Sequence, residues 1–538
     1  MTMNSLLLVA SLAIPFAWLA AFALPNLRGR ALSTLWLAPA PALAAGLVGL
    51  RTGRPIEWTA SSTGPSLSLD RSGALLLVSA ALLWMMVSLP LFRSERPNDR
   101  MGLCWLMTMV GNLGVFVAGD LVSFYCLYAL ASIPAFGLFA FSPDGQSRRA
   151  GAVYMAFTIL GEAVLLLAFA MLVASEPHGS LRIHDVMASL AASPWRGAVL
   201  ALVIAGFGMK IGTVPFNGWM PLTYTASPTA VAMVLSGAGV NAGVIGLLRF
   251  LPLGDALPVA GSALMGLGFV TAFYGVLVGL TQRQPSTVLA YSSISQMGLI
   301  AAACGAALGQ PDLLNSDAIA FYAANHLFVK AALFLTVSLW AIPGINSSRF
   351  HFVLAGALAL GLAGLPPTGG YLAKLALKPG FASGVTASLA TLSSIGSALL
   401  MTHFVMCLEG ARATEAAPAG LVRNWLAVAA GAMLVPWALY GLAGEAMSKA
   451  FGLSNLVDST WPVAVGLALA FVLRRAHWSL PDWPEGDTIG LWEAGFGRLM
   501  RGGPPVESLE ARSRQWPAAS LALVIIALVI AGASALGH

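Results

Sequence analysis

The sequence predicts an all-α polytopic membrane protein with about 14–16 transmembrane helices. Of its 538 residues, 58% are hydrophobic and only 9% are charged, whereas soluble domains carry about 25% charged residues. Apolar stretches long enough to cross a bilayer, roughly 20 residues each, recur along the whole chain. A water-soluble surface cannot be built from so few charges, so most of the surface is predicted to face lipid or other membrane subunits.

Sixteen stretches qualify as candidate spans. Those near residues 41, 205, 362 and 467 are the weakest, because proline, a charge or short length interrupts them. The full set is centred near residues 14, 41, 83, 110, 131, 163, 205, 238, 268, 297, 330, 362, 395, 432, 467 and 526.

The loops between these stretches predict the topology. With the N-terminus outside, the loops on the inner side carry 17 Lys and Arg residues and the outer loops carry 8. The positive-inside rule therefore favours an external N-terminus. We expect a multi-pass protein of a bacterial inner (plasma) membrane, with the first apolar stretch retained as a helix.

Charge and cysteine content exclude several other classes of protein. The net charge is +6, but the basic residues are scattered singly, so nucleic acid is not an expected partner. The four cysteines form no CxxC pair, so no iron-sulfur or zinc ligand set is expected. We expect no metal, no cofactor and no catalytic or redox centre in this chain.

Lysines inside apolar stretches are the first candidate functional residues. Three of the five lysines occupy such positions, namely Lys210, Lys330 and Lys374. An ionisable group in a bilayer costs several kcal/mol unless it is paired or hydrated. Arginine keeps its proton at ordinary pH, whereas lysine can release one, as a proton relay requires. The alternatives are a structural ion pair and a side chain that reaches to the interface.

Other polar residues in the spans extend this candidate set. Glu162 is the only carboxylate near the middle of a span, and is expected to be the partner of a lysine, either in a relay or as a fixed ion pair. His326 precedes Lys330 by four residues, so both lie on one helix face, and imidazole can pass protons. His403 is a weaker candidate of the same kind. Asp120 follows Gly119 at a helix start, where capping is the expected role.

A weak internal symmetry accompanies the lysines. The proline-interrupted span at Lys210 and Pro215 recurs roughly 150 residues later at Pro366, Pro367 and Lys374. Paired interruptions of this kind are typical of transporters built from inverted repeats.

Four blocks around these residues resemble the proton-conducting transporter family. That family includes the antiporter-like membrane subunits of respiratory complex I, of formate hydrogenlyase-type and other membrane hydrogenases, and of Mrp antiporters. The blocks, in chain order, are residues 210–230 (KIGTVPF, then WMP and SPTA), 289–298 (LAYSSISQMG), 325–334 (NHLFVKAALF) and 364–374 (GLPPTGG with the lysine).

The resemblance implies a core of two inverted five-helix repeats, each with one broken helix. It implies that Lys210 holds the proton of the first half-channel, that Lys330 with His326 is the central relay, and that Lys374 faces the exit of the second. The predicted organisation is residues 1–100 for three N-terminal helices, 101–250 and 251–410 for the two repeats, 411–475 for additional helices, 476–516 for a cytoplasmic amphipathic connector and 517–538 for a last helix.

Two positions depart from the family pattern. The glutamate usual in the fifth helix falls on Ala129, and Glu162, one helix later, is the candidate substitute. The lysine or histidine usual in the eighth helix falls on Ser236 or Asn241, which can hold water or hydrogen bonds but store no proton. The stretch around Asn241 is similar to membrane subunits of inorganic-carbon uptake complexes.

Two functions therefore remain open at this stage. The first is a proton-translocating subunit of a redox complex of the NADH-quinone oxidoreductase or hydrogenase type. The second is a non-redox exchanger or energiser, of the Mrp cation/proton or inorganic-carbon (bicarbonate/CO2) type. Either function implies that the partners are other membrane subunits and a peripheral soluble subunit, with protons, or sodium, as the transported ion.

Overall fold

The computed structural model describes residues 2–60, 64–92, 98–141, 145–340, 349–382, 384–410, 420–441, 446–476, 483–486 and 488–490. The chain divides into two units, Met1–Glu485 and Gly486–His538. Most of the predicted connector and the predicted helix 517–538 lie outside the described residues. The first unit contains all three intramembrane lysines.

The first unit is almost entirely helical. Its first part consists of α1 (Met3–Ala23), α2 (Pro25–Ser33), η1 (Leu35–Leu37), α3 (Ala40–Thr52), β1 (Ile56–Thr59), β2 (Ser66–Leu69), α4 (Arg71–Pro90), α5 (Asp99–Val115), α6 (Leu121–Ser132), η3 (Pro134–Leu138), α7 (Gly145–Ala174), α8 (Ile183–Ser189), η4 (Leu190–Ala192), α9 (Arg196–Ile211), α10 (Trp219–Ala226), α11 (Thr229–Val234), the π-helical turn η5 (Leu235–Gly239) and α12 (Val240–Phe250). Its second part consists of α13 (Pro258–Gly279), α14 (Pro285–Gly309), α15 (Ser316–Trp340), α16 (Arg349–Ala363), α17 (Gly369–Leu377), η7 (Lys378–Phe381), α18 (Gly384–Gly410), α19 (Leu421–Tyr440), α20 (Met447–Ala450) and α21 (Leu453–Arg475).

Twelve helices among the described residues are long and apolar enough to cross a membrane. They account for twelve of the sixteen predicted spans. The candidates near residues 110, 205 and 362 fall on α5, α9 and α16, which have 17, 16 and 15 residues. Helices α9 and α16 are short because the chain breaks each of them; α9 resumes as α10, and α16 resumes as α17. The prediction of an all-α polytopic membrane protein is confirmed.

Both predicted helix breaks are present and are built alike. Helix α9 ends at Gly212, whose φ of 70° lies in the left-handed region that glycine adopts without a Cβ clash. Helix α16 ends before Gly364, with φ of 101°. Proline follows each glycine within three residues, at Pro215 in the first break and at Pro366 and Pro367 in the second. Proline lacks a backbone N–H and so cannot continue the helical ladder.

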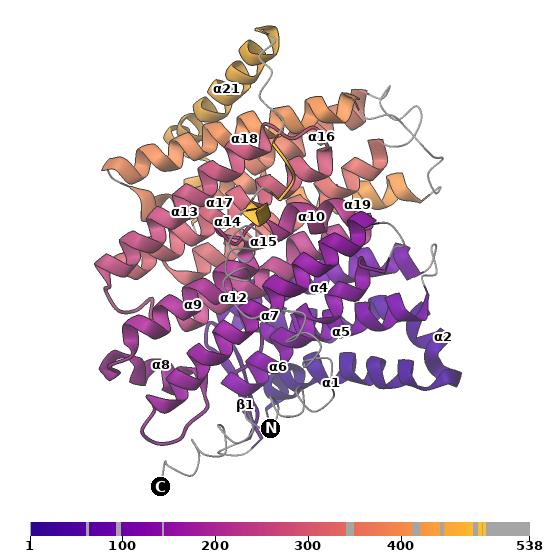
Figure 1. Cartoon of the computed structure of the whole chain (residues 1–538), viewed down its shortest axis with the longest axis vertical. Coiled ribbons are helices and arrows are strands. Elements are labelled where there is room, and N and C mark those ends of the chain that lie inside the picture. The colour runs from indigo at the N-terminus through magenta and orange to yellow at the C-terminus, as the bar shows by residue number, and fades with distance from the viewer. Residues whose placement is uncertain are drawn as a thin grey trace, which may run out of the picture. The chain divides into compact units, whose positions relative to one another are not determined.

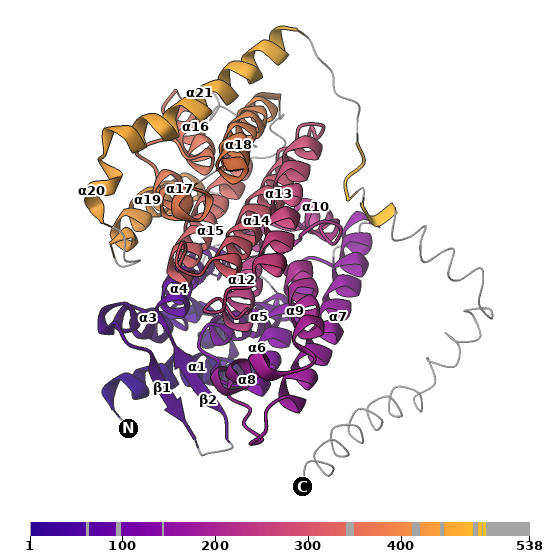
Figure 2. The same ribbon diagram turned by 90° about the vertical axis from the view of Figure 1, so that its left-hand side faces the viewer.

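Helices α14 and α15 form the centre of this unit. Every residue of their apolar windows is buried, against 22% for α1 and for α21. Figures 1 and 2 show α12 to α15 between the early helices α1 to α6 and the late helices α16 to α21. The outer helices expose large apolar side chains such as Phe16 and Phe471. The ionisable residues His326 and Lys330 of α15 are therefore shielded from lipid by other helices.

Glycines allow α13 to approach α14 closely. A Cβ added at Gly268 would lie 2.3 Å from the backbone nitrogen of Ala302, and one at Gly275 would lie 2.6 Å from that of Ser295. Small residues at helix interfaces in membranes permit this backbone-to-backbone packing. The close contact fixes the position of α14, which carries partners of the central lysine.

Two local features complete the framework. Asp120 accepts a hydrogen bond from the backbone nitrogen of Ser123 at 2.8 Å and so caps α6, as predicted. Between α3 and α4 the strands β1 and β2 form an antiparallel hairpin in which Ile56 pairs with Leu69. The hairpin is a short exception to the all-helical prediction, and it lies in a connecting segment.

Candidate functional site

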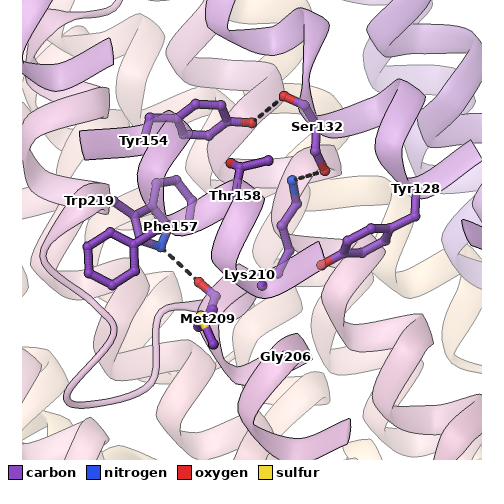
Figure 3. Close-up of a pocket in the computed structure, with 10 residues that line it drawn as sticks. Tyr128, Ser132, Tyr154, Phe157, Thr158, Gly206, Met209, Lys210 and Trp219 are labelled. Carbon is purple, nitrogen blue, oxygen red and sulfur yellow. Dashed lines mark hydrogen bonds between the residues drawn. The ribbon is translucent and has the colours of Figure 1, made fainter. Parts of the chain in front are cut away.

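Lys210 occupies the last turn of α9, where the helix breaks. Its Nζ donates a hydrogen bond to Ser132 Oγ of α6 at 2.7 Å and lies 5.5 Å from the centre of the Tyr128 ring (Figure 3). The absence of a side chain at Gly243 makes room for the lysine, since a Cβ there would lie 3.0 Å from Lys210 Cβ. Ala129, the α6 position where the expected glutamate is missing, directly follows Tyr128 and lies three residues before Ser132. In this part of α6 a serine hydroxyl therefore accepts the hydrogen bond from Lys210.

A cavity of about 20 Å³ adjoins Lys210. That volume is enough for about one water molecule. Its walls are held by two hydrogen bonds, from Tyr154 Oη to the Ser132 carbonyl oxygen and from Trp219 Nε1 to the Met209 carbonyl oxygen, each 2.8 Å (Figure 3). The cavity lining comprises Tyr128, Ser132, Tyr154, Phe157, Thr158, Gly161, Gly206, Met209, Lys210 and Trp219.

Glu162 lies next to this cavity on α7. Its side chain is 7% exposed, and its Oε1 has no hydrogen-bond partner among the described residues. The carboxylate and the Lys210 ammonium interact electrostatically, yet the described structure contains no ion pair between them within 4.0 Å. The structure thus places Glu162 near Lys210, as the sequence suggested, but not in direct contact with it.

His326 and Lys330 lie at the centre of α15, and both are fully buried. Lys330 Nζ donates to the Leu289 carbonyl oxygen at 2.7 Å and to Ser292 Oγ, both on α14. Neither ring nitrogen of His326 has a hydrogen-bond partner of good geometry among the described residues. Buried polar atoms are rarely left unpaired, so both ring nitrogens remain available for hydrogen bonds to water or to a neighbouring side chain.

Ser236 and Asn241 face α15 from the α11–α12 span. Ser236 lies in the π-helical turn η5, where its Oγ contacts the Met233 carbonyl oxygen at 3.5 Å and its backbone lies beside His326. Asn241 Nδ2 donates to the Ala323 carbonyl oxygen at 3.2 Å. Asn241 Oδ1 is buried without a partner among the described residues. The Ser236 backbone therefore lies next to His326, and Asn241 contacts α15 at Ala323, three residues before His326. π-helical turns such as η5 often occur at functional sites.

Lys374 lies in α17, just after the second helix break. Its Nζ donates to the Ala363 carbonyl oxygen at 2.7 Å and to Ser394 Oγ of α18 at 2.9 Å. Gly364 makes room for its stem, because a Cβ there would lie 2.9 Å from Lys374 Cδ. Each of the three lysines therefore donates to a serine hydroxyl of a neighbouring helix.

A set of buried polar side chains between Lys330 and Lys374 was not predicted. Gln296 lies one turn after Ser292 on α14 and accepts a hydrogen bond from Tyr322 Oη of α15. Gln296 Nε2 donates to Ser397 Oγ of α18 at 3.2 Å, and Ser394 lies one turn before Ser397. The sequence signal was available, since Gln296 lies in one of the four blocks that resemble the family, but only the fold shows which side chains it contacts.

His403 is not part of this set. Its Nε2 donates to the Gln282 carbonyl oxygen at 2.7 Å, in the turn between α13 and α14. The structure therefore places His403 at the end of the bundle, in a backbone contact, and away from the three lysines.

No described acidic group lies within 4.0 Å of the nitrogen of any of the three lysines. A serine hydroxyl both donates and accepts hydrogen bonds, so it can serve either protonation state of an amine. The described residues also contain no group of three or more potential metal ligands. The arrangement is suited to moving protons between neutral and charged amines.

Sequence and structure comparisons give the class of the protein. The profile of the NADH:quinone oxidoreductase/Mrp antiporter transmembrane family matches residues 118–402, more than half of the chain. The chain belongs to this family and is a multi-pass membrane protein.

Two relatives and two structures illustrate the range of this family. A Rhizobium meliloti protein named as part of a probable K(+)/H(+) antiporter is 30% identical over 59% of this chain, and the match spans 33% of that protein. NADH-quinone oxidoreductase subunit N of Polaromonas naphthalenivorans is 30% identical over 53% of this chain and 62% of its own length. A chain of the Mrp complex from Dietzia sp. DQ12-45-1b has a TM-score of 0.68 at 22% identity, over 87% of this chain and all of that one. A chain of the archaeal membrane-bound sulfane sulfur reductase has a TM-score of 0.66 at 22% identity, over 86% of this chain and 99% of that one.

The match spans only about a third of the antiporter protein and about three fifths of the NADH-quinone oxidoreductase protein. The structural likeness establishes the fold. Both relatives are named as subunits, and both structures are of membrane complexes.

Proposed function

We propose that the chain is a proton-translocating, antiporter-like membrane subunit of a complex related to NADH-quinone oxidoreductase or to a membrane hydrogenase. Protons move through a relay of Lys210, Glu162, His326, Lys330 and Lys374, with water between the side chains. The chain has no role in redox chemistry, which belongs to partner subunits, including a peripheral soluble one. The protein resides in a bacterial inner membrane with its N-terminus outside.

One observation carries this proposal. Three lysines lie on three separate membrane helices, and each nitrogen donates to a serine hydroxyl, not to a carboxylate. A structural ion pair needs a fixed opposite charge, and a lysine that reaches to the interface needs solvent. Lys330 is fully buried on one of the two most enclosed helices, so neither alternative accounts for it.

The direct test is proton transport by the complex in vesicles, with Lys330 replaced. We expect Lys330→Ala to lower transport by at least about 100-fold, since removal of a proton-transferring side chain typically costs this much. Lys330→Arg should do nearly as much harm, because a guanidinium keeps its proton. Full activity in the arginine variant, at normal amounts of assembled protein, would contradict the relay.

The second candidate function is ion exchange without redox chemistry, of the Mrp or inorganic-carbon type. Ala129, Ser236 and Asn241 favour it, because titratable groups usual in the family are absent from these positions. An absorbance spectrum of the complex purified with its native partners distinguishes the two functions. Broad absorbance around 400 nm, as iron-sulfur clusters give, supports a redox-driven pump. A colourless complex with sodium- or potassium-dependent proton release supports an exchanger.

A further inference from the structure

Glu485 follows α21 in the chain and contacts the N-terminal end of α14. Its Oε1 accepts a hydrogen bond of 2.8 Å from Thr287 Oγ1, and Thr287 is fully buried. A second bond holds the same segment, because Gln282 Nε2 donates to the Trp483 carbonyl oxygen at 3.0 Å. A chain segment about 200 residues away in sequence therefore supplies a carboxylate to the start of the central helix α14.

The position on α14 relates Glu485 to the central lysine. Thr287 precedes Leu289 and Ser292, the two residues of α14 to which Lys330 donates. From residue 287 to residue 292 the helix rises about 7.5 Å, at 1.5 Å per residue. Helix α14 thus contacts the Glu485 carboxylate at its N-terminal end and the Lys330 ammonium about a turn and a half further along.

The same contact lies where the first broken helix meets the second half of the bundle. Thr287 Oγ1 also hydrogen-bonds Thr225 Oγ1 of α10 at 3.0 Å. Glu485, Thr287 and Thr225 therefore form a short line of oxygen atoms between α10 and α14. Hydroxyl groups can pass a proton from one hydrogen bond to the next because they donate and accept together.

Other carboxylates at this end of the bundle are bound differently. Asp99 pairs with Arg28 at 2.7 Å and Glu409 pairs with Arg474 at 3.6 Å. Glu485 instead has a buried hydroxyl as its hydrogen-bond donor and lies at a helix N-terminus, which favours negative charge. By the positive-inside prediction this end of the bundle faces the cytoplasm.

We propose that Glu485 is the carboxylate through which cytoplasmic protons reach Lys330. The carboxylate takes up one proton from the aqueous phase and becomes a neutral acid. It then gives one proton, through Thr287 and water, toward the amine of Lys330, which becomes an ammonium, and Glu485 returns to a carboxylate. This inference rests on the proposed function and adds the place of proton uptake.

The test is proton transport at several pH values by the assembled complex with Glu485→Gln. Glutamine keeps an oxygen for the Thr287 hydroxyl but cannot carry a proton in this range. We expect transport to fall about tenfold at pH 8 and far less at pH 6, because protons are scarce at the higher pH and a collecting group matters most there. Glu485→Asp, which retains a carboxyl group, should keep the wild-type pH profile at a lower rate.

Glu409→Gln is the matched control, since it removes a carboxylate at the same end of the bundle and should leave the profile unchanged. The inference fails if Glu485→Gln transports at the wild-type rate, if its loss is the same at every pH, or if Glu409→Gln shows the same loss. Lys330→Ala in the same vesicles tests the proposed function separately. An inactive Lys330→Ala beside an unaffected Glu485→Gln would remove only this inference.

Discussion

The two halves of the bundle place their outer lysines beside similar helix breaks but surround them differently. In the first half, Lys210 has one serine partner, a cavity of about 20 Å³ and the nearby Glu162. In the second half, Lys374 is held by a serine and a backbone carbonyl. Buried polar side chains then extend from its serine partner toward Lys330.

This difference indicates how each half could pass a proton. In the second half, Lys330 donates to Ser292, Gln296 donates to Ser397, and Lys374 donates to Ser394. Ser292 and Gln296 are one turn apart on α14, as are Ser394 and Ser397 on α18, so polar side chains recur between the two lysines with gaps of about one helical turn. In the first half, η5 and α12 lie between Lys210 and α15 and provide Ser236 and Asn241, neither of which titrates. In the proposed relay, proton transfer through the first half therefore depends more on water and on Glu162. Variants in each half can test that contrast.

The largest expected effect comes from removing each outer lysine. We expect Lys374→Met and Lys210→Met each to lower proton transport by about 100-fold, because a methionine of similar length fills the space but carries no proton. Transport by the complex in vesicles, with assembled protein quantified, is the measurement. If Lys210→Met kept most of the activity, the first half would be a scaffold and conduction would belong to the second half alone.

Breaking the polar set of the second half should have the next largest effect. Gln296→Leu leaves the hydroxyls of Tyr322 and Ser397 without their partner, and we expect transport to fall by roughly 10- to 100-fold. Ser295→Ala on the same helix is the control, since its buried hydroxyl has no partner in the described structure. Equal activity in both variants would show that the side chains around Gln296 are not the path.

Glu162→Gln should have a smaller effect, confined to the first half. The carboxylate acts on Lys210 without a direct contact, so we expect transport to fall by about three- to tenfold, corresponding to about 1 kcal/mol. The rate of Glu162→Gln, alone and combined with Lys210→Met, is the measurement. A wild-type rate in the single variant would mean that Glu162 does not replace the glutamate missing at Ala129.

The smallest effect on transport is expected for a packing variant. In Gly268→Ala the added methyl group meets the backbone of α14, so α13 and α14 must separate, at a cost of about 1–3 kcal/mol. Thermal denaturation in detergent should show a Tm lower by a few degrees. Gly266→Ala, two residues earlier with nothing within 4 Å, should leave the Tm unchanged. An unchanged Tm in both would show that the close packing adds little stability.

The sequence by itself determined the class of this protein. It also determined where the membrane helices contain a charged residue, a break or a cap. Composition alone requires a lipid-facing surface, because so few charges cannot cover a soluble one. The three intramembrane lysines, the two proline breaks and the cap at Asp120 are local features, so they could be predicted before the fold. The four blocks near the lysines also identified the family.

Only the tertiary structure decided the partners of these lysines. Ser132, Ser292 and Ser394 are ordinary serines in sequence, and each becomes significant because a distant helix brings a lysine nitrogen to its hydroxyl. The same holds for the polar set around Gln296 and for the docking of Glu485 on α14. Hydrogen bonds act over about 3 Å, whereas the residues they join lie tens to hundreds of positions apart in the chain, so helix packing, and not local sequence pattern, decides which groups meet.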